Sequence, residues 1–251
     1  MILPSITAHS GCEGTPRDSI DSISHAIALG ADLVEMDVRC ARDGVLRISH
    51  DQVGEAEYAS KLTLQDVFES LVGTGLGLNC DIKEPMIVYD VLSMGECYGF
   101  GPDRLFLSGS TSPEQLACDP QIAKRANVYL NIEQVLKMLY LPELYRQKET
   151  QKFCELMNQP WPFVNKKPLT AQETDVLLDL VETLGVYGIN LPHQLLTEDL
   201  AERMRARNIP FSVWTVNQPE TVVRCIQLGA KNVTTLTVKI ALEQRKRILG
   251  I

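Results

Sequence analysis

The sequence predicts an α/β protein of the (β/α)8 TIM-barrel class. Three observations lead to this prediction: the chain has 251 residues, it contains eight short strand-like runs, and amphipathic segments separate these runs. A length of about 250 residues is typical of such barrels. A doubly wound open sheet is the main alternative, because it alternates strands and helices in the same way.

The predicted strands are short apolar or β-branched runs bounded by turn-forming residues. They cover residues 5–9, 33–38, 76–83, 104–108, 127–132, 186–191, 211–216 and 232–236. Eight strands with intervening helices is the count that a closed barrel requires.

Several of the segments between strands carry helix start and stop signals. Ile20, Ile23 and Ile27 recur at helical spacing and stop at Gly30, a natural C-terminal cap. Thr63 is placed to cap a second helix, whose apolar side chains follow at helical spacing.

Later helices are marked by proline and charge. Residues 112–114 read Ser-Pro-Glu, a typical helix start. Residues 197–207 begin with acids and end with arginines, which matches the helix dipole at both ends. Residues 219–228 form another predicted helix, and we interpret 133–168 as a long helical excursion between the fifth and sixth strands.

No internal repeat, low-complexity tract or interdomain linker is visible, so we expect residues 1–251 to form a single domain. The net charge of −8 argues against nucleic acid as a partner, because phosphate backbones are bound by clustered basic residues. The one dense basic run, at Arg245, Lys246 and Arg247, is expected to offset the dipole of a terminal helix.

The cellular compartment of the protein is predicted from three features of the sequence. The start MILPSITAHSG lacks the pattern of a signal peptide, and no apolar run is long enough for a transmembrane segment. The seven cysteines include no CxxC pair and are expected to be reduced thiols. We therefore expect a cytoplasmic protein; its oligomeric state does not follow from the sequence, and a homo-oligomer stays an option.

Charged residues share one face of two predicted strands. Residues two apart in a strand point to the same side, so Glu35 and Asp37 lie together, as do Asp81 and Lys83 on the third predicted strand. In a barrel, the carboxyl ends of the strands form the active-site mouth. Three carboxylates converging there need a cation, and oxygen ligands favour a hard ion, Mg²⁺ or Ca²⁺.

Two histidines complete the predicted site. His9 ends the first strand, and His50 follows a second apolar run, with Asp51 placed to orient it. We predict that one histidine acts as base and the other as acid in cleaving a phosphate ester, while the metal and Lys83 stabilise the developing charge.

Other residues receive weaker interpretations. Taken singly, each site residue is most simply an ordinary surface or satisfied polar group, and so are His25 and His193. Trp214 ends the seventh strand, where it suits either the core or the wall of the substrate mouth.

Five ordered motifs resemble the glycerophosphodiester phosphodiesterase family. They read AHSG (8–11), GADLVEMDV (30–38), RDGVLRISHD (42–51), CDIK (80–83) and VWTVN (213–217). The resemblance implies a TIM barrel, a divalent metal held by Glu35, Asp37 and Asp81, and His9 and His50 as the acid/base pair. It also implies a small phosphodiester as substrate, attacked by its own glycerol hydroxyl or by water.

The chain departs from the family pattern in places that concern the substrate. Ser10 stands at the phosphate-binding position where the family has an arginine, and Asp81 stands where hydrolases usually have glutamate. The insertion after His50-Asp51 is reduced to about two dozen residues, and TTLTV (234–238) replaces the family's Thr-Asp-x-Pro.

These departures keep two alternatives open. Ser10, Asp81 and the short insertion partly resemble the spider-venom phospholipase D branch, whose members transfer phosphate within the substrate and release a cyclic phosphate. A barrel without catalysis that senses phosphodiesters is the second alternative. The leading hypothesis is a metal-dependent phosphodiesterase that recycles phosphate or polyol from small glycerophosphodiesters.

Overall fold

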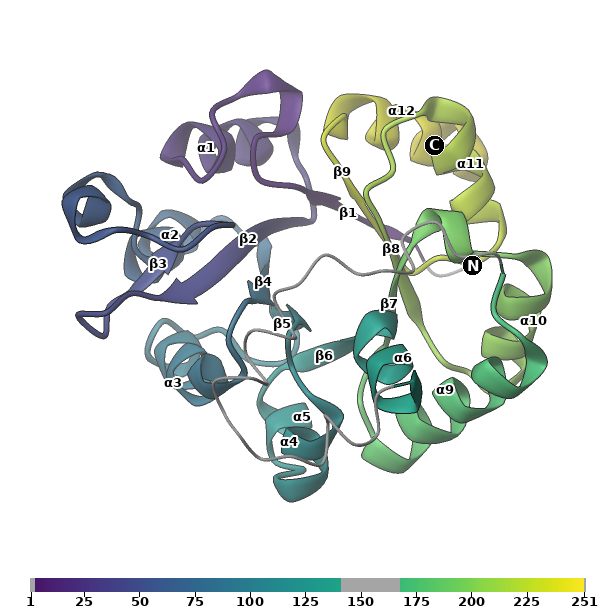
Figure 1. Ribbon diagram of the computed structural model, residues 1–251. Helices are drawn as coiled ribbons and strands as arrows, with labels where there is room; N and C mark the ends of the chain where they lie inside the picture. The colour runs from purple at the N-terminus through teal and green to yellow at the C-terminus, as the bar shows by residue number, and fades with distance from the viewer. Residues whose placement is uncertain (1–2, 141–167, 251) are drawn as a thin grey trace.

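The protein forms a closed barrel of eight parallel strands surrounded by helices (Figure 1). The computed structural model describes residues 3–140 and 168–250. The strands are β1 (Ser5–Ala8), β2 (Leu33–Cys40), β3 (Leu46–Ile48), β4 (Gly77–Ile82), β5 (Leu105–Gly109), β6 (Asn127–Asn131), β7 (Gly188–Pro192), β8 (Phe211–Trp214) and β9 (Asn232–Thr235).

Closure is what distinguishes this fold from the open sheet. Strand β1 pairs in parallel with β2 on one side and with β9 on the other, so the sheet has no free edge at that point. The TIM-barrel prediction is confirmed and the doubly wound alternative is wrong. Strand β3 was not among the predicted strands; it pairs antiparallel to the end of β2 as a hairpin outside the barrel wall.

The helices cover the outside of the barrel. The α-helices are α1 (Ile20–Leu29), α2 (Leu64–Leu71), α3 (Val88–Cys97), α4 (Pro113–Cys118), α5 (Ile122–Arg125), α6 (Ile132–Tyr140), α9 (Ala171–Leu184), α10 (Glu198–Ala206), α11 (Pro219–Gln227) and α12 (Val238–Leu249). Short 3-10 helices are η1 (Cys12–Gly14), η2 (Glu55–Ser60), η3 (Pro85–Ile87) and η4 (His193–Leu195).

The predicted helix ends agree with the observed caps. Helix α1 ends at Gly30, whose φ of 74° is the left-handed conformation of a C-terminal cap. The side chains of Thr63 and Ser112 accept hydrogen bonds from the backbone three residues on, capping α2 and α4. Of the predicted excursion at 133–168, α6 is described and residues 141–167 lie outside the described part of the chain.

The two faces of the barrel wall differ in polarity. Val34, Met36 and Val38 on β2 are almost fully buried in the apolar layer between wall and helices. The opposite faces carry polar side chains that bond to one another around the barrel. Thr7 Oγ1 donates to Asn232 Oδ1 at 2.6 Å, and Asn190 Nδ2 donates to Asn131 Oδ1 at 2.9 Å. The inner face of the wall thus includes pairs of hydrogen-bonded polar side chains.

The three basic residues near the C-terminus have two different roles. Lys246 and Arg247 lie in the last turn of α12, where they complement the dipole as expected. Arg245 instead is buried, donates to Pro4 O at 3.0 Å and pairs with Asp32. It joins the last helix to the start of the barrel, a role that the helix-dipole interpretation missed.

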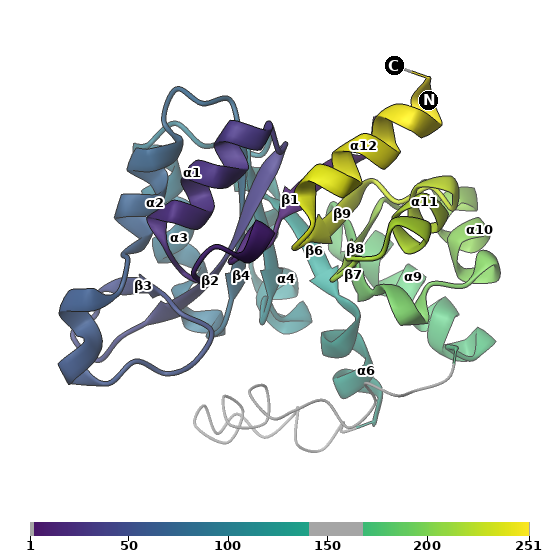
Figure 2. The same ribbon diagram turned by 90° about the horizontal axis from the view of Figure 1, so that it is seen from above.

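The β2–β3 hairpin and α6 extend from the same end of the barrel, where the strands have their carboxyl ends (Figure 2). Within residues 3–140 and 168–250, no helix has the length and apolar character needed to cross a membrane. The cysteines in these ranges are free thiols.

Candidate active site

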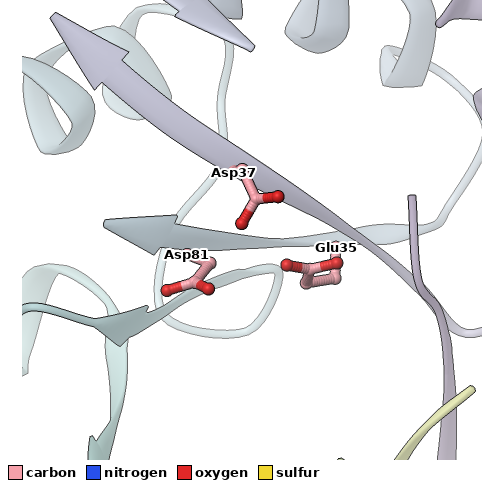
Figure 3. Close-up of side chains that lie close together, drawn as sticks. All are labelled: Glu35, Asp37 and Asp81. Atoms are coloured by element: carbon pink, nitrogen blue, oxygen red, sulfur yellow. The ribbon is translucent and has the colours of Figure 1, made fainter. Parts of the chain in front are cut away.

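Three carboxylates lie close together where β2 and β4 approach the mouth. The register of the two strands pairs Asp37 with Asp81, and Glu35 lies one inward-facing position earlier on β2. One oxygen from each of the three residues lies within 4.8 Å of the others, and Figure 3 shows the side chains facing a common space. The predicted convergence of these residues is therefore present in the fold.

The cluster brings three acidic side chains together in a buried place. Glu35 is 5% exposed and Asp37 is 2% exposed. Burial, followed by the charges of Asp37 and Asp81, raises the pKa of Glu35 well above its usual range. Burial also raises the pKa of Asp81, although the nearby charge of Lys83 opposes this shift.

Two oxygens of the cluster have no hydrogen-bond partner in the described part of the chain, Asp37 Oδ2 and Asp81 Oδ1. Buried polar atoms are normally paired, so these two are available to a ligand. Gly109 at the end of β5 keeps the space open. Its φ is 77°, and a side chain at this position would place its Cβ 1.9 Å from Asp81 Oδ1. Three converging carboxylates, two of them with an unpaired oxygen, fit a hard divalent cation such as Mg²⁺ or Ca²⁺.

Lys83 bridges two of the carboxylates. Its Nζ lies 2.5 Å from Asp37 Oδ1 and 2.9 Å from Asp81 Oδ2. Burial lowers the pKa of Lys83, but the charges of Asp81 and Asp37 outweigh burial and raise it overall. The side chain is therefore a fixed positive charge beside the cluster.

His9 stands next to the cluster on the opposite side. Its backbone N–H donates to Thr235 O at 2.9 Å, which holds the end of β1 against β9. Its Nδ1 lies 3.0 Å from Ser10 O and 3.8 Å from Glu35 Oε2. Because a carbonyl oxygen only accepts, this hydrogen bond places the ring proton on Nδ1.

His50 is linked to the cluster through the backbone. Ser49 N donates to Asp37 O at 2.9 Å, and Arg39 Nε donates to His50 O at 2.9 Å. The exposed His50 ring has its Nδ1 2.9 Å from Asp51 Oδ1, as the pairing of the two residues predicts. The structure thus brings His9 to the carboxylates, and it places the His50 ring on the adjoining loop with Asp51 as its partner.

Three further residues from the sequence analysis are Ser10, Trp214 and His193. Ser10 is fully buried, its hydroxyl donates to Asp18 Oδ1, and its backbone N–H donates to Glu35 Oε2 at 3.4 Å. Trp214 ends β8, and its Nε1 is buried without a hydrogen-bond partner among the described residues. His193 lies in η4, and burial lowers its pKa.

Sequence reasoning missed two residues at the mouth. Arg17 Nη2 lies 3.7 Å from Asp37 Oδ2, although Arg17 belongs to the loop after β1. A basic residue in a loop that follows a strand end was a usable signal for it, since such loops form the mouth. Gly109, in the Ser-Gly-Ser run at the end of β5, gave only the ordinary signal of a turn.

The fold and this site together define a barrel enzyme whose mouth combines a carboxylate cluster with a fixed positive charge. Residues 9–235 match the model of the glycerophosphoryl diester phosphodiesterase family. Because the match spans most of the chain, the protein belongs to this family, and it is a phosphoric diester hydrolase. No curated protein sequence matches the chain.

Solved structures share the fold at low sequence identity. A phosphodiesterase from Oleispira antarctica, in complex with the product sn-glycerol-3-phosphate, is 14% identical, with a TM-score of 0.69 and 96% of each chain covered. A glycerophosphodiester phosphodiesterase from Thermotoga maritima is 18% identical, with a TM-score of 0.65 over 97% of this chain and 99% of that one. One from Parabacteroides distasonis is 17% identical, with a TM-score of 0.66 over 99% and 98%.

Proposed function

We propose that the protein is a metal-dependent phosphodiesterase that cleaves a glycerophosphodiester, or a related small polyol phosphodiester, to a phosphomonoester and an alcohol. The observation that carries this proposal is the buried cluster of Glu35, Asp37 and Asp81, with unpaired oxygens beside the positive charge of Lys83. The family supports the reaction class, and the product in the Oleispira antarctica structure supports the substrate class.

Glu35, Asp37 and Asp81 would hold the divalent ion. When bound, Mg²⁺ or Ca²⁺ would polarise the phosphoryl oxygens and offset the charge that develops on them. Lys83 contributes a second positive charge on the β4 side of the mouth, which favours an anionic substrate and its more charged transition state.

We assign one proton transfer to each of the two histidines. With its proton on Nδ1, His9 presents Nε2 as a base, and we assign it to the attacking hydroxyl or water. Asp51 orients His50 through Nδ1, and we assign His50 to protonating the leaving alcohol. The indole of Trp214 at the end of β8 would form a wall against the apolar or polyol part of the substrate.

We further infer that the chain acts as one barrel domain, because the family match runs from the end of β1 to the end of β9 and these two strands pair to close the barrel. The cytoplasmic location, the homo-oligomer option and the choice of Mg²⁺ or Ca²⁺ stay predictions from the sequence. The intramolecular alternative is favoured by one observation: between β3 and β4 the chain forms only η2 and α2, so the mouth lacks a larger subdomain there.

A ³¹P NMR time course on glycerophosphodiesters and lysophospholipids, with Mg²⁺, with Ca²⁺ and with EDTA, tests the proposal. We expect a linear phosphomonoester that appears only with a divalent ion. An early cyclic phosphate would identify the intramolecular reaction instead. Absence of any product across the panel, or full turnover in EDTA, would contradict the proposal.

His9→Ala and His50→Ala test the acid/base assignment. Each is expected to lower kcat by about 10²–10⁴-fold, the usual contribution of general acid–base catalysis, with an unchanged melting temperature. His25→Ala is the matched control, because His25 is an exposed histidine on α1. Near-full activity in either site variant would overturn the role given to that histidine.

A further inference from the structure

The loop that follows β1 is held in place by the residue after His9. The Ser10 hydroxyl donates to Asp18 Oδ1 at 2.9 Å and accepts from Asp18 N at 2.7 Å. Asp18 adopts a φ of 55°, a conformation that costs a non-glycine residue energy unless its surroundings impose it. Ser10 therefore fixes the path of the loop at the residue next to Arg17.

Arg17 extends from this loop toward the carboxylates. Its side chain lies against Gly11, where a Cβ would come within 2.8 Å of Arg17 Cγ, and Gly11 itself has a φ of 85°. The Arg17 side chain is 55% exposed, and its Nη2 lies 3.7 Å from Asp37 Oδ2, beyond hydrogen-bond distance. The guanidinium is thus held over the mouth with its donors unused by the described part of the chain.

Other cations near the cluster are already bound. Lys83 contacts both Asp37 and Asp81, and Arg39 pairs with Glu84 while donating to the backbone of His50. A guanidinium with free donors forms a planar fork that matches two phosphate oxygens, which the point charge of a lysine does not.

Arg17 and Lys83 approach the same carboxylate from different elements. Arg17, in the loop after β1, has its Nη2 3.7 Å from Asp37 Oδ2, and Lys83, directly after β4, has its Nζ 2.5 Å from Asp37 Oδ1. The two positive charges therefore face different oxygens of Asp37.

We propose that Arg17 binds the non-bridging oxygens of the substrate phosphate, and that Ser10 positions Arg17 through Asp18. The proposal deepens the function proposed above and rests on it. Ser10 thus acts on the phosphate through the loop and makes no contact with the phosphate itself. The phosphate is held between the guanidinium on the β1 side and Lys83 on the β4 side.

The test is calorimetric titration of sn-glycerol-3-phosphate into the Mg²⁺-loaded full chain, together with kinetics on the diester that the wild type cleaves best. Arg17→Ala is expected to weaken product binding about 10–100-fold, the loss of a charge-assisted pair of hydrogen bonds, and to raise KM more than it lowers kcat. Arg17→Lys is expected to recover only part of the affinity, because the charge returns without the fork.

Ser10→Ala is expected to give a smaller loss of affinity than Arg17→Ala, since the guanidinium stays but its loop is loosened. Arg42→Ala is the matched control, because Arg42 is an 86% exposed arginine whose ion pair with Glu55 spans 4.0 Å. The control is expected to bind product as the wild type does. The two arginine positions are exposed, so their variants are expected to keep the wild-type melting temperature, whereas Ser10→Ala is expected to lower it slightly because two hydrogen bonds of a buried hydroxyl are lost.

The outcomes separate this proposal from the function on which it rests. Wild-type affinity and KM in Arg17→Ala, with turnover of the diester intact, would overturn the role of Arg17 and leave the function standing. If the wild type cleaves no diester but binds the product, and Arg17→Ala loses that binding, the proposed function is overturned and the phosphate contact is supported. Equal losses in Arg17→Ala and Arg42→Ala would reduce the effect to net charge and overturn the assignment.

Discussion

Asp32 directly precedes β2 and Asp37 lies within β2 near the mouth, and the two aspartates have different surroundings. Asp32, just before the strand, accepts from Ile6 N at 2.7 Å and pairs with Arg245. Asp37, near the mouth, contacts Lys83 through Oδ1, while its Oδ2 lacks a hydrogen-bond partner among the described residues.

The difference separates a structural acid from a ligand-binding one. The bonds of Asp32 join β1 and α12, which are far apart in sequence, so its charge stabilises the closed barrel. An unsatisfied buried oxygen costs about 1–3 kcal/mol, and Asp37 carries that cost at the mouth. Free energy lost in this way is recovered when a cation binds, which is why functional sites hold such groups.

The largest effects are expected when each aspartate is neutralised in turn. Asp37→Asn is expected to lower kcat/KM by at least about 10²–10³-fold, the scale for removing one electrostatic stabiliser of a transition state, with no loss of melting temperature. Asp32→Asn is expected to do the reverse. Asp32→Asn should keep the wild-type turnover per folded molecule. Its free energy of unfolding should fall by about 1–3 kcal/mol, and its melting temperature should fall by roughly 2–4 °C for each kcal/mol.

Steady-state kinetics and calorimetric melting of both variants check this pair. Loss of activity in Asp32→Asn at unchanged stability, or retained activity in Asp37→Asn, would contradict the division of roles.

A smaller effect is expected from closing the space beside Asp81. Gly109→Ala would place a methyl group 1.9 Å from Asp81 Oδ1 and 2.5 Å from Ile82 O at a φ of 77°, so both the carboxylate and the end of β4 must shift. We expect Mg²⁺ affinity to fall about 10–100-fold, as for other changes that misorient a ligand. Gly99→Ala, at a φ of 73° with nothing within 4 Å, controls for backbone strain alone. Titration with Mg²⁺ measures both, and equal affinities in the two variants would refute the spacing argument.

The smallest expected effect is a pH-dependent change in stability without metal. Because the pKa of Glu35 is raised in the folded state, the folded protein binds a proton that the unfolded chain releases, and stability falls as pH rises from the ordinary value through the raised one. Glu35→Gln removes this loss. In EDTA the melting temperature of Glu35→Gln should exceed that of the wild type near pH 7–8. The difference should be about 2–4 °C for each kcal/mol of unfolding free energy that the variant regains, and it should shrink toward pH 4.

With Mg²⁺ the order is expected to reverse, because the wild type gains the full binding free energy and the variant does not. Melting curves across pH, with EDTA and with Mg²⁺, check both halves. A gap that widens on acidification in EDTA would contradict the cause assigned to the raised pKa.

The strand-borne half of the site could be predicted from the sequence. The period of two placed Glu35 and Asp37 on one face, and the shared carboxyl ends of parallel strands brought Asp81 and Lys83 beside them. Helix ends such as Gly30 were equally accessible, because caps depend on local chemistry.

The loop-borne half could not be predicted in the same way. The approach of Arg17 to Asp37 depends on a loop path set by the Ser10–Asp18 hydrogen bonds and a positive φ, which no periodicity encodes. The pairing of Asp32 with Arg245 spans 213 residues of sequence, so only the closed barrel reveals it. Contacts of this kind follow from tertiary structure.

We propose that the mouth carboxylates Glu35, Asp37 and Asp81 bind a divalent ion. Calorimetric titration of Mg²⁺ and Ca²⁺ into EDTA-treated and desalted protein tests this binding most directly, with Asp37→Asn and Asp32→Asn measured beside the wild type. We expect one site in the wild type and in Asp32→Asn, and loss of that site in Asp37→Asn. Absence of binding in the wild type, or an unchanged site in Asp37→Asn, would contradict the proposal.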